Sequence, residues 1–216
     1  MQNKIIYIVS NDRSGSTVLD FLLGQHPDII SIGELHHLYK YLVCNEEYLK
    51  DTLLKCTCGK RVNECEFWSM VQKELGTNLK KFPINLNHAY NLKERFSINM
   101  LTNYQQIKIL KNKFISRLVK TNPKILNSRL LYFLSGYNHI ARNNFKLLDV
   151  ICSVSAKKII VDSSKTPHRL KYLFQYSPDQ VFIVHLARNP VGVIYSMMKR
   201  KYDIDKAISI CLPITG

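Results

Sequence analysis

Three short apolar runs stand out against the mixed polarity of this chain. They are residues 4–10, 158–161 and 180–186. Each is nearly unbroken by polar side chains, a pattern typical of strands that are buried on both faces of a parallel sheet. The pattern therefore predicts three parallel strands.

A loop with hydroxyl or charged residues follows each run, and a helical pattern follows each loop. The predicted helices are residues 15–23, 166–175 and 190–201. Pro167 and Pro190 stand where the first turn of a helix tolerates proline. Strand, loop and helix repeated in this order predict the α/β fold class, with ligands at the carboxyl ends of the strands.

Between residues 35 and 152 the pattern changes to helices. One helix is predicted by an apolar stripe at helical spacing, formed by Ile107, Leu110, Phe114 and Leu118. The pattern of residues 130–152 predicts another helix. We interpret residues 35–152 as a helical insertion within one domain, residues 1–216, because a chain of this length fits a single core.

The formal net charge of +15 is large and unevenly distributed. Residues 95–148 contain Lys and Arg but neither Asp nor Glu. Such a segment favours anionic partners, although a solvated basic helix face is the plainer alternative. No nucleic-acid motif is present, so we expect at most a weak association with anionic surfaces.

Two further absences bear on where the protein acts. No run approaches the roughly 18 apolar residues of a membrane span. The N-terminus begins with strand-like sequence and has no secretory signal. We therefore expect a cytoplasmic location.

The turn after the first run carries the most informative residues. Gly15 ends a short polar turn and opens a helix, which exposes unpaired backbone N–H groups and the positive end of the helix dipole. Arg13 and the hydroxyls of Ser14, Ser16 and Thr17 add charge and donors at that point. This segment predicts a site for phosphate or a similar tetrahedral anion. It lacks the lysine of the nucleotide-triphosphatase motif GxxxxGK[ST], which disfavours ordinary ATP chemistry.

Two later segments add candidate anion ligands at strand ends. Arg188 follows the third run, and Ser196 and Arg200 are four residues apart, which predicts that they share a helix face. Lys165 follows the second run. The plainer interpretations are solvated surface residues and, for Lys165, an ion pair with Asp162.

Together these segments resemble the sulfotransferases that use 3′-phosphoadenosine-5′-phosphosulfate (PAPS). Residues 13–17 resemble their 5′-phosphosulfate loop. Arg188 and Ser196 resemble their 3′-phosphate motif, with Arg200 as a further basic contact. The resemblance covers residues 4–201, and residues 26–34 and 161–165 are similar to the bacterial and tyrosylprotein members. It implies a P-loop NTPase-like, three-layer fold with a central parallel sheet and a helical insertion.

The resemblance implies that a sulfuryl group moves from PAPS, the co-substrate, to a hydroxyl or amine acceptor by in-line displacement, with no metal required. Glu34 matches the catalytic base, with His36 and His37 as alternatives. Lys165 matches the lysine that stabilises the transition state, and Arg13 adds charge beside it. A Glu34 that only pairs with a basic residue is the structural alternative.

Two other functions compete with this interpretation. One is a P-loop kinase or NTPase, and the other is a non-catalytic basic module that binds anions.

Members of the resembled family usually continue beyond the equivalent of Gly216, so we expect the C-terminal part of the domain to be absent. The acceptor class stays open among carbohydrates, lipids, peptides and small molecules, as does the oligomeric state.

A cysteine cluster is not explained by any of these functions. Cys56, Cys58 and Cys65 lie within ten residues, and Cys44 could add a fourth thiol. A zinc knuckle, a disulfide and reduced thiols are the alternatives. The C-x-C spacing is tighter than the usual zinc spacing, and a disulfide is the least expected in a cytosolic chain.

Overall fold

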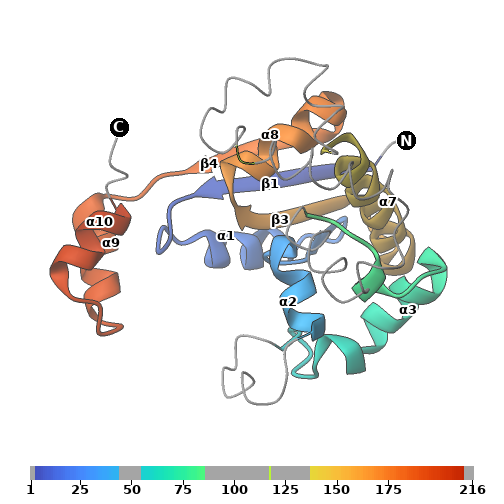
Figure 1. Ribbon diagram of the computed structural model, residues 1–216, viewed down its shortest axis with the longest axis horizontal. Helices are drawn as coiled ribbons and strands as arrows, with labels where there is room; N and C mark the ends of the chain where they lie inside the picture. Colours follow the sequence, from blue (N-terminus) through green and yellow to red (C-terminus); the bar gives the residue numbers. More distant parts are fainter. Residues whose placement is uncertain (1–2, 44–54, 86–116, 118–136, 212–216) are drawn as a thin grey trace. The chain divides into compact units, whose positions relative to one another are not determined.

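The computed structural model describes residues 3–43, 55–85, 117 and 137–211 (Figure 1). Main-chain contacts divide the chain into two compact units. The first unit comprises residues 1–35, 157–170 and 179–216, and the second comprises residues 36–156 and 171–178.

A parallel sheet forms the centre of the first unit. Its four strands are β1 (Lys4–Ser10), β2 (Ile29–Ser31), β3 (Ile159–Lys165) and β4 (Val181–Leu186). The strand order is β2-β3-β1-β4, and every neighbouring pair is parallel. The predicted α/β class and the three predicted strands are confirmed. The sequence pattern missed β2, whose three residues are too few to show a periodicity.

Strand β1 occupies an inner position because its side chains are apolar on both faces. Ile5, Tyr7 and Ile8 are buried, as expected for a strand paired on both edges. Ile8 packs with Ile29 of β2 and Val161 of β3 in one apolar cluster. This cluster holds β1, β2 and β3 together, and the loops of the first unit extend from these strands.

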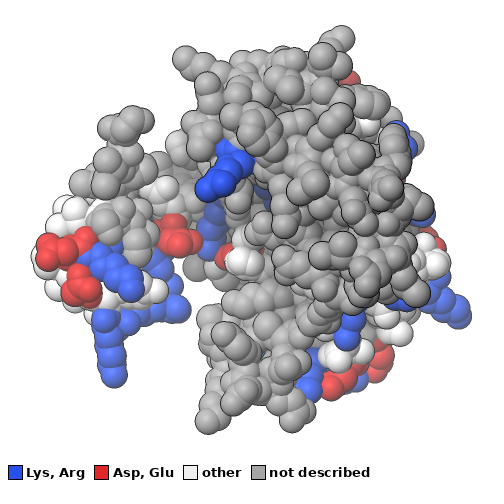
Figure 2. Space-filling model, in the orientation of Figure 1, with Lys and Arg blue, Asp and Glu red and all other residues white. Residues whose placement is uncertain are grey.

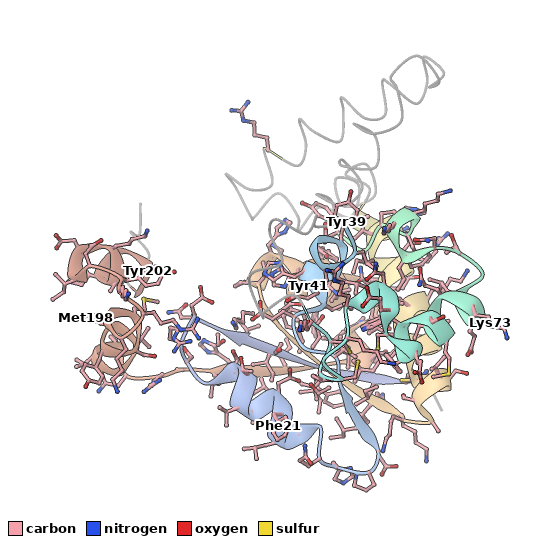
Figure 3. The ribbon with its side chains drawn as sticks, turned by 90° about the horizontal axis from the view of Figure 1, so that it is seen from below. Phe21, Tyr39, Tyr41, Lys73, Met198 and Tyr202 are labelled. Atoms are coloured by element: carbon pink, nitrogen blue, oxygen red, sulfur yellow. The ribbon has the colours of Figure 1, made fainter. Side chains whose placement is uncertain are left out.

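Helix α1 (Ser16–Leu23) packs against the sheet. Leu19 and Leu23 contact the apolar cluster of the strands. Phe21, on the side of α1 that faces away from the sheet, is 66% exposed (Figure 3). The helix therefore runs from the loop after β1 along one face of the sheet.

Two short helices follow β4. Helix α9 (Pro190–Met198) begins at Asn189, whose side chain accepts a hydrogen bond from the N–H of Val191, and α10 (Ile204–Cys211) packs on α9. Val193, Met197 and Ala207 form their shared buried cluster. Helix α8 (Pro167–Tyr176), which follows β3, begins in the first unit and ends in the second.

The described part of the second unit is mostly helical. Its elements are the end of the 3-10 helix η1 (Leu35–His37), α2 (Leu38–Val43), the 3-10 helices η4 (Val62–Glu64) and η5 (Leu79–Lys81), α3 (Glu66–Leu75) and α7 (Tyr137–Ser155). Helix α3 packs against α7. The side chain of Asn144, buried on α7, donates to the carbonyl of Ile84 at 2.8 Å. The predicted stripe at 107–118 and most of the basic segment lie outside the described residues.

Within the parts of the chain described here, no helix is both long and apolar enough to span a bilayer.

A buried ion pair underlies the carboxyl end of β3. The guanidinium of Arg169 donates to Asp162 Oδ2 at 3.1 Å from Nη2 and at 3.3 Å from Nε, and both side chains are almost fully buried. The other oxygen of Asp162 accepts hydrogen bonds from the backbone and hydroxyl of Ser164. Every charge in this pair is therefore compensated.

We predict that Arg169→Met lowers the free energy of unfolding by about 3–5 kcal/mol, because it leaves the Asp162 carboxylate buried without its counter-ion. Urea unfolding followed by circular dichroism measures the change. The control is Lys158→Met, which removes an exposed cation of the same unit and should change stability little. Equal effects of the two variants would contradict the prediction.

Candidate functional site

The strand register brings three loops to one edge of the sheet. Val9 lies in register with Lys165, and Ser10 lies in register with Leu186. Because the strands are parallel, the loops after β1, β3 and β4 leave the same edge side by side. The three predicted anion-binding segments of the sequence therefore meet at one place.

The loop after β1 presents the N-terminus of α1. Gly15 is the N-cap residue and has a φ of 95°, a left-handed conformation that glycine adopts without steric cost. No side chain caps the helix, and its first turn carries no acidic residue. Ser14 and Ser16 are buried beside this end, while Thr17 is exposed. The positive end of the helix dipole is thus available to an anion.

Arg13 links the loop after β1 to the loop and helix after β4. Its Nε donates a hydrogen bond to Ser196 Oγ at 3.1 Å. Arg188 Nη1 donates to the backbone carbonyl of Arg13 at 3.0 Å. A Cβ on Gly192 would lie 3.1 Å from Arg188 Nε, so the missing side chain leaves room for that guanidinium against α9. Two segments 175 residues apart in the chain are joined here directly.

Arg200 differs from its predicted position. The pattern placed Ser196 and Arg200 on one helix face, but α9 ends at Met198. The N–H of Lys201 bonds the carbonyl of Met198 at 2.9 Å, and Lys201 is left-handed with a φ of 65°. Arg200 therefore lies in a C-terminal turn of the Schellman type rather than on the regular helix.

Basic side chains gather over this turn and the end of α9. Lys199, Arg200 and Lys201 are all exposed, with the acidic Asp203 and Asp205 following them (Figure 2). Met198 and Tyr202 are also exposed here, at 45% and 41% (Figure 3).

Lys165 holds two carboxylates at the end of β3. Its ammonium lies 2.6 Å from Glu34 Oε1 and 3.5 Å from Asp12 Oδ1. The Lys165 and Glu34 side chains are largely buried, at 19% and 28% exposed, whereas Asp12 is 65% exposed. The sequence analysis identified Lys165 and Glu34 separately but missed Asp12. Its position next to Arg13, in the predicted anion-binding turn, could have marked Asp12 as a candidate.

An irregularity in β3 directs Lys165 to this position. The register between β1 and β3 advances from Tyr7 opposite Asp162 to Val9 opposite Lys165, which leaves one extra residue in β3. Such a bulge re-aims the side chain that follows it. On the other edge of β3, Ser163 N–H donates to the carbonyl of Gly33 at 3.0 Å, which brings Glu34 alongside.

Backbone strain coincides with two of the candidate residues. Among the described residues, four other than glycine have a positive φ: Arg13, Ala156, Lys165 and Lys201. Ala156 and Lys201 end helices, where a left-handed residue is common. Arg13 and Lys165, each with a φ of 64°, have no such explanation. Left-handed conformations of bulky residues cost of order 1–3 kcal/mol and cluster at functional sites.

Asp20 is a buried carboxylate on α1 that the sequence pattern did not single out. It accepts a hydrogen bond from Ser163 Oγ at 2.9 Å, which ties α1 to β3. Burial raises its pKa above the ordinary value of 3.8, and the carboxylates of Asp162 and Glu34 add to that effect. Hydrogen bonds from Ser31 and Ser163 act in the opposite direction. Asp20 therefore positions the helix that carries the candidate anion site.

Of the remaining candidates, His36 and His37 fall in the second unit. Cys44 lies outside the described residues.

The side chains gathered in the first unit have the chemistry expected for binding a polyanion and for accepting a proton. Arg13, Arg188 and Lys165 supply fixed positive charge around the start of α1. Glu34 supplies a carboxylate within hydrogen-bond distance of Lys165. Preorganised cations beside a carboxylate suit a group transfer in which negative charge develops on a leaving group.

Comparison with known proteins identifies a family for this chain. The model of the sulfotransferase family matches residues 6–207 of this chain. No curated protein and no solved structure matches it. The matched residues include the three candidate anion segments and all of the sheet except the first two residues of β1.

We predict that the effect of Asp20→Asn on stability is more favourable at neutral pH than at acidic pH. The folded chain raises the pKa of Asp20, so this residue contributes stability below its unfolded pKa of about 3.8, and that contribution is lost as the pH rises through the folded value. Asparagine has no proton to lose. The difference in melting temperature, variant minus parent, should therefore be larger at pH 7 than at pH 4.

The control Asp28→Asn removes an exposed carboxylate of the same unit. A difference for Asp20→Asn that stays constant between the two pH values would refute the assignment of a raised pKa.

Proposed function

The chain belongs to the sulfotransferase family, and we propose that it transfers a sulfuryl group from PAPS to a hydroxyl or amine of an acceptor. The acceptor is a carbohydrate, lipid, peptide or small molecule. The fold of the family is P-loop-like, in agreement with the parallel sheet and the glycine turn that opens α1.

A single observation carries the proposal. The two segments proposed to bind the phosphates touch one another, through Arg188 on the carbonyl of Arg13 and through Arg13 on Ser196. PAPS carries its phosphosulfate and its second phosphate on the same ribose. One molecule of PAPS therefore needs two adjacent anion sites, and an ordinary nucleoside triphosphate needs only one.

We assign the 5′ end of the donor to the loop after β1. The backbone N–H groups at the start of α1 and the hydroxyls of Ser14, Ser16 and Thr17 would hold the phosphosulfate. Gly15 leaves the backbone open for its approach.

We assign the 3′-phosphate to Arg188 and Ser196, with Arg200 as a further basic contact. The Ser196 hydroxyl accepts from Arg13, so its own proton is available to a phosphate oxygen. Guanidinium groups suit phosphate because their planar donors match its geometry.

The reaction follows from these assignments. The acceptor oxygen or nitrogen forms a bond to sulfur as the bond from sulfur to the 5′-phosphate oxygen breaks, which releases adenosine 3′,5′-bisphosphate. Glu34 takes the acceptor proton. Lys165 and Arg13 stabilise the charge on the sulfuryl and leaving oxygens, and the Lys165 ammonium has three donors to share between Glu34 and the donor.

The first test is nucleotide binding. Isothermal titration with adenosine 3′,5′-bisphosphate should show one site per chain, and Arg13→Ala and Arg188→Ala should each weaken it by about tenfold or more, since charge-assisted hydrogen bonds are worth 1.5–3 kcal/mol. Arg142→Ala removes an exposed arginine of α7 and is the matched control. Magnesium-dependent ATP binding with no affinity for the bisphosphate would favour a kinase or NTPase and overturn the proposal.

The second test separates the base from binding. Glu34→Gln keeps the size of the side chain but removes its basicity, so turnover should fall by about 10²–10⁴-fold while affinity for the bisphosphate is kept. Release of the bisphosphate from PAPS, measured with a panel of phenols, sugars and peptides as acceptors, gives the rate. Parent-like turnover in this variant would move the base to His36 or His37.

A further inference from the structure

Three thiols of the second unit lie together, and none of them belongs to the residues assigned above. Cys65 Sγ is 3.5 Å from both Cys56 Sγ and Cys58 Sγ, and all three sulfurs lie within 4.8 Å of one another. All three are free thiols. Their exposure is graded, since Cys58 is exposed, Cys56 is half-buried and Cys65 is buried.

The spacing of the sulfurs matches that of ligands on a shared metal ion. A zinc–sulfur bond of about 2.3 Å in tetrahedral geometry sets neighbouring sulfurs about 3.8 Å apart. A disulfide requires about 2.05 Å. The separations of 3.5 Å are close to the first value and far from the second.

The backbone explains how a C-x-C spacing reaches this geometry. Cys56 N–H donates to the carbonyl of Lys60 at 2.9 Å, and Gly59 N–H donates to the carbonyl of Cys56 at 2.8 Å. Gly59 is left-handed, with a φ of 82°, which lets the chain fold back sharply after Cys58. An antiparallel bridge between Lys55 and Arg61 closes the turn.

The third sulfur comes from the start of a helix. Cys65 is the N-cap residue of α3. The positive end of the α3 dipole favours a thiolate at this position.

The surroundings of the thiols suit metal binding. The backbone of Lys60 forms a hydrogen bond with the sulfur of Cys58. Backbone hydrogen bonds to sulfur are the kind of outer-shell contact that orients a metal ligand. A divalent ion would displace the protons of all three thiols and keep the buried sulfur charged.

We propose that Cys56, Cys58 and Cys65 bind one thiophilic divalent cation, Zn²⁺, which cross-links the turn at residues 55–61 to the start of α3. Thiolates are soft ligands and select zinc over the hard cations Mg²⁺ and Ca²⁺. Three thiolates leave a fourth position for water or another donor. None of its three ligands belongs to the residues assigned to the nucleotide or to the transfer reaction.

The experiment uses the full chain, reduced and stripped of metal with a chelator. Zinc content after one equivalent is added back, and titration with Co²⁺ followed by thiolate-to-cobalt charge-transfer absorption, should both give one ion per chain. Loss of an outer-shell contact alone costs 10–100-fold in metal affinity, so Cys58→Ser, which removes a ligand, should cost more than about 100-fold. Chelation should lower the melting temperature of the parent but leave that of Cys58→Ser unchanged.

Cys58 is exposed, so its variant should fold, and circular dichroism of the metal-free chains checks that it does. Cys152→Ala, at a buried cysteine of α7 whose pKa burial raises to about 11, is the control and should bind Co²⁺ like the parent. Failure of the reduced parent to bind Co²⁺ or Zn²⁺ would overturn the proposal. Equal metal affinity in Cys58→Ser, or a disulfide among these cysteines in the freshly isolated chain, would overturn it as well.

Discussion

The parallel pairing of β1 with β3 on one side and β4 on the other is the constraint on which the candidate site depends. It places the carboxyl ends of three strands side by side, so residues distant in the sequence become neighbours without long connecting loops. A slip of one residue would turn Lys165 to the opposite face of the sheet. Ile160 and Val161 are consecutive residues of β3 and both are buried, so such a slip would disturb the packing on both faces of the strand.

The first unit contains two groups of paired charges, one buried beneath the candidate site and one at the edge of the sheet. Beneath the site, Asp162 and Arg169 are enclosed and fully hydrogen-bonded, which suits a structural pair. At the sheet edge, Lys165 is shared between Glu34 and the exposed Asp12. In the proposed site an anion could replace Asp12 on Lys165 at low cost, since the Asp12 carboxylate is exposed. The left-handed backbone of Arg13 and Lys165 agrees with a site held in shape before its ligand binds.

Local patterns in the sequence predicted the strands, the glycine turn and the separate candidate residues. They could not predict β2, which is too short, or the bulge in β3, which depends on pairing with β1. They predicted an end of α9 that is too late in the chain, because the Schellman turn at its end has Lys201 where such a turn usually has glycine. Only the sheet order reveals two contacts between residues more than 130 positions apart. They are the hydrogen bond from Arg13 to Ser196 and the ion pair of Lys165 with Glu34.

The central claim is that two adjacent anion sites hold one nucleotide with phosphates at both ends of its ribose. It is tested most directly by comparing the affinities of adenosine 3′,5′-bisphosphate and adenosine 5′-phosphate in the parent, in Arg188→Ala and in Thr17→Val. The account predicts that the parent and Thr17→Val prefer the bisphosphate, whereas Arg188→Ala loses most of that preference because its 3′-phosphate contact is gone. Equal preference in the parent and in Arg188→Ala would contradict it.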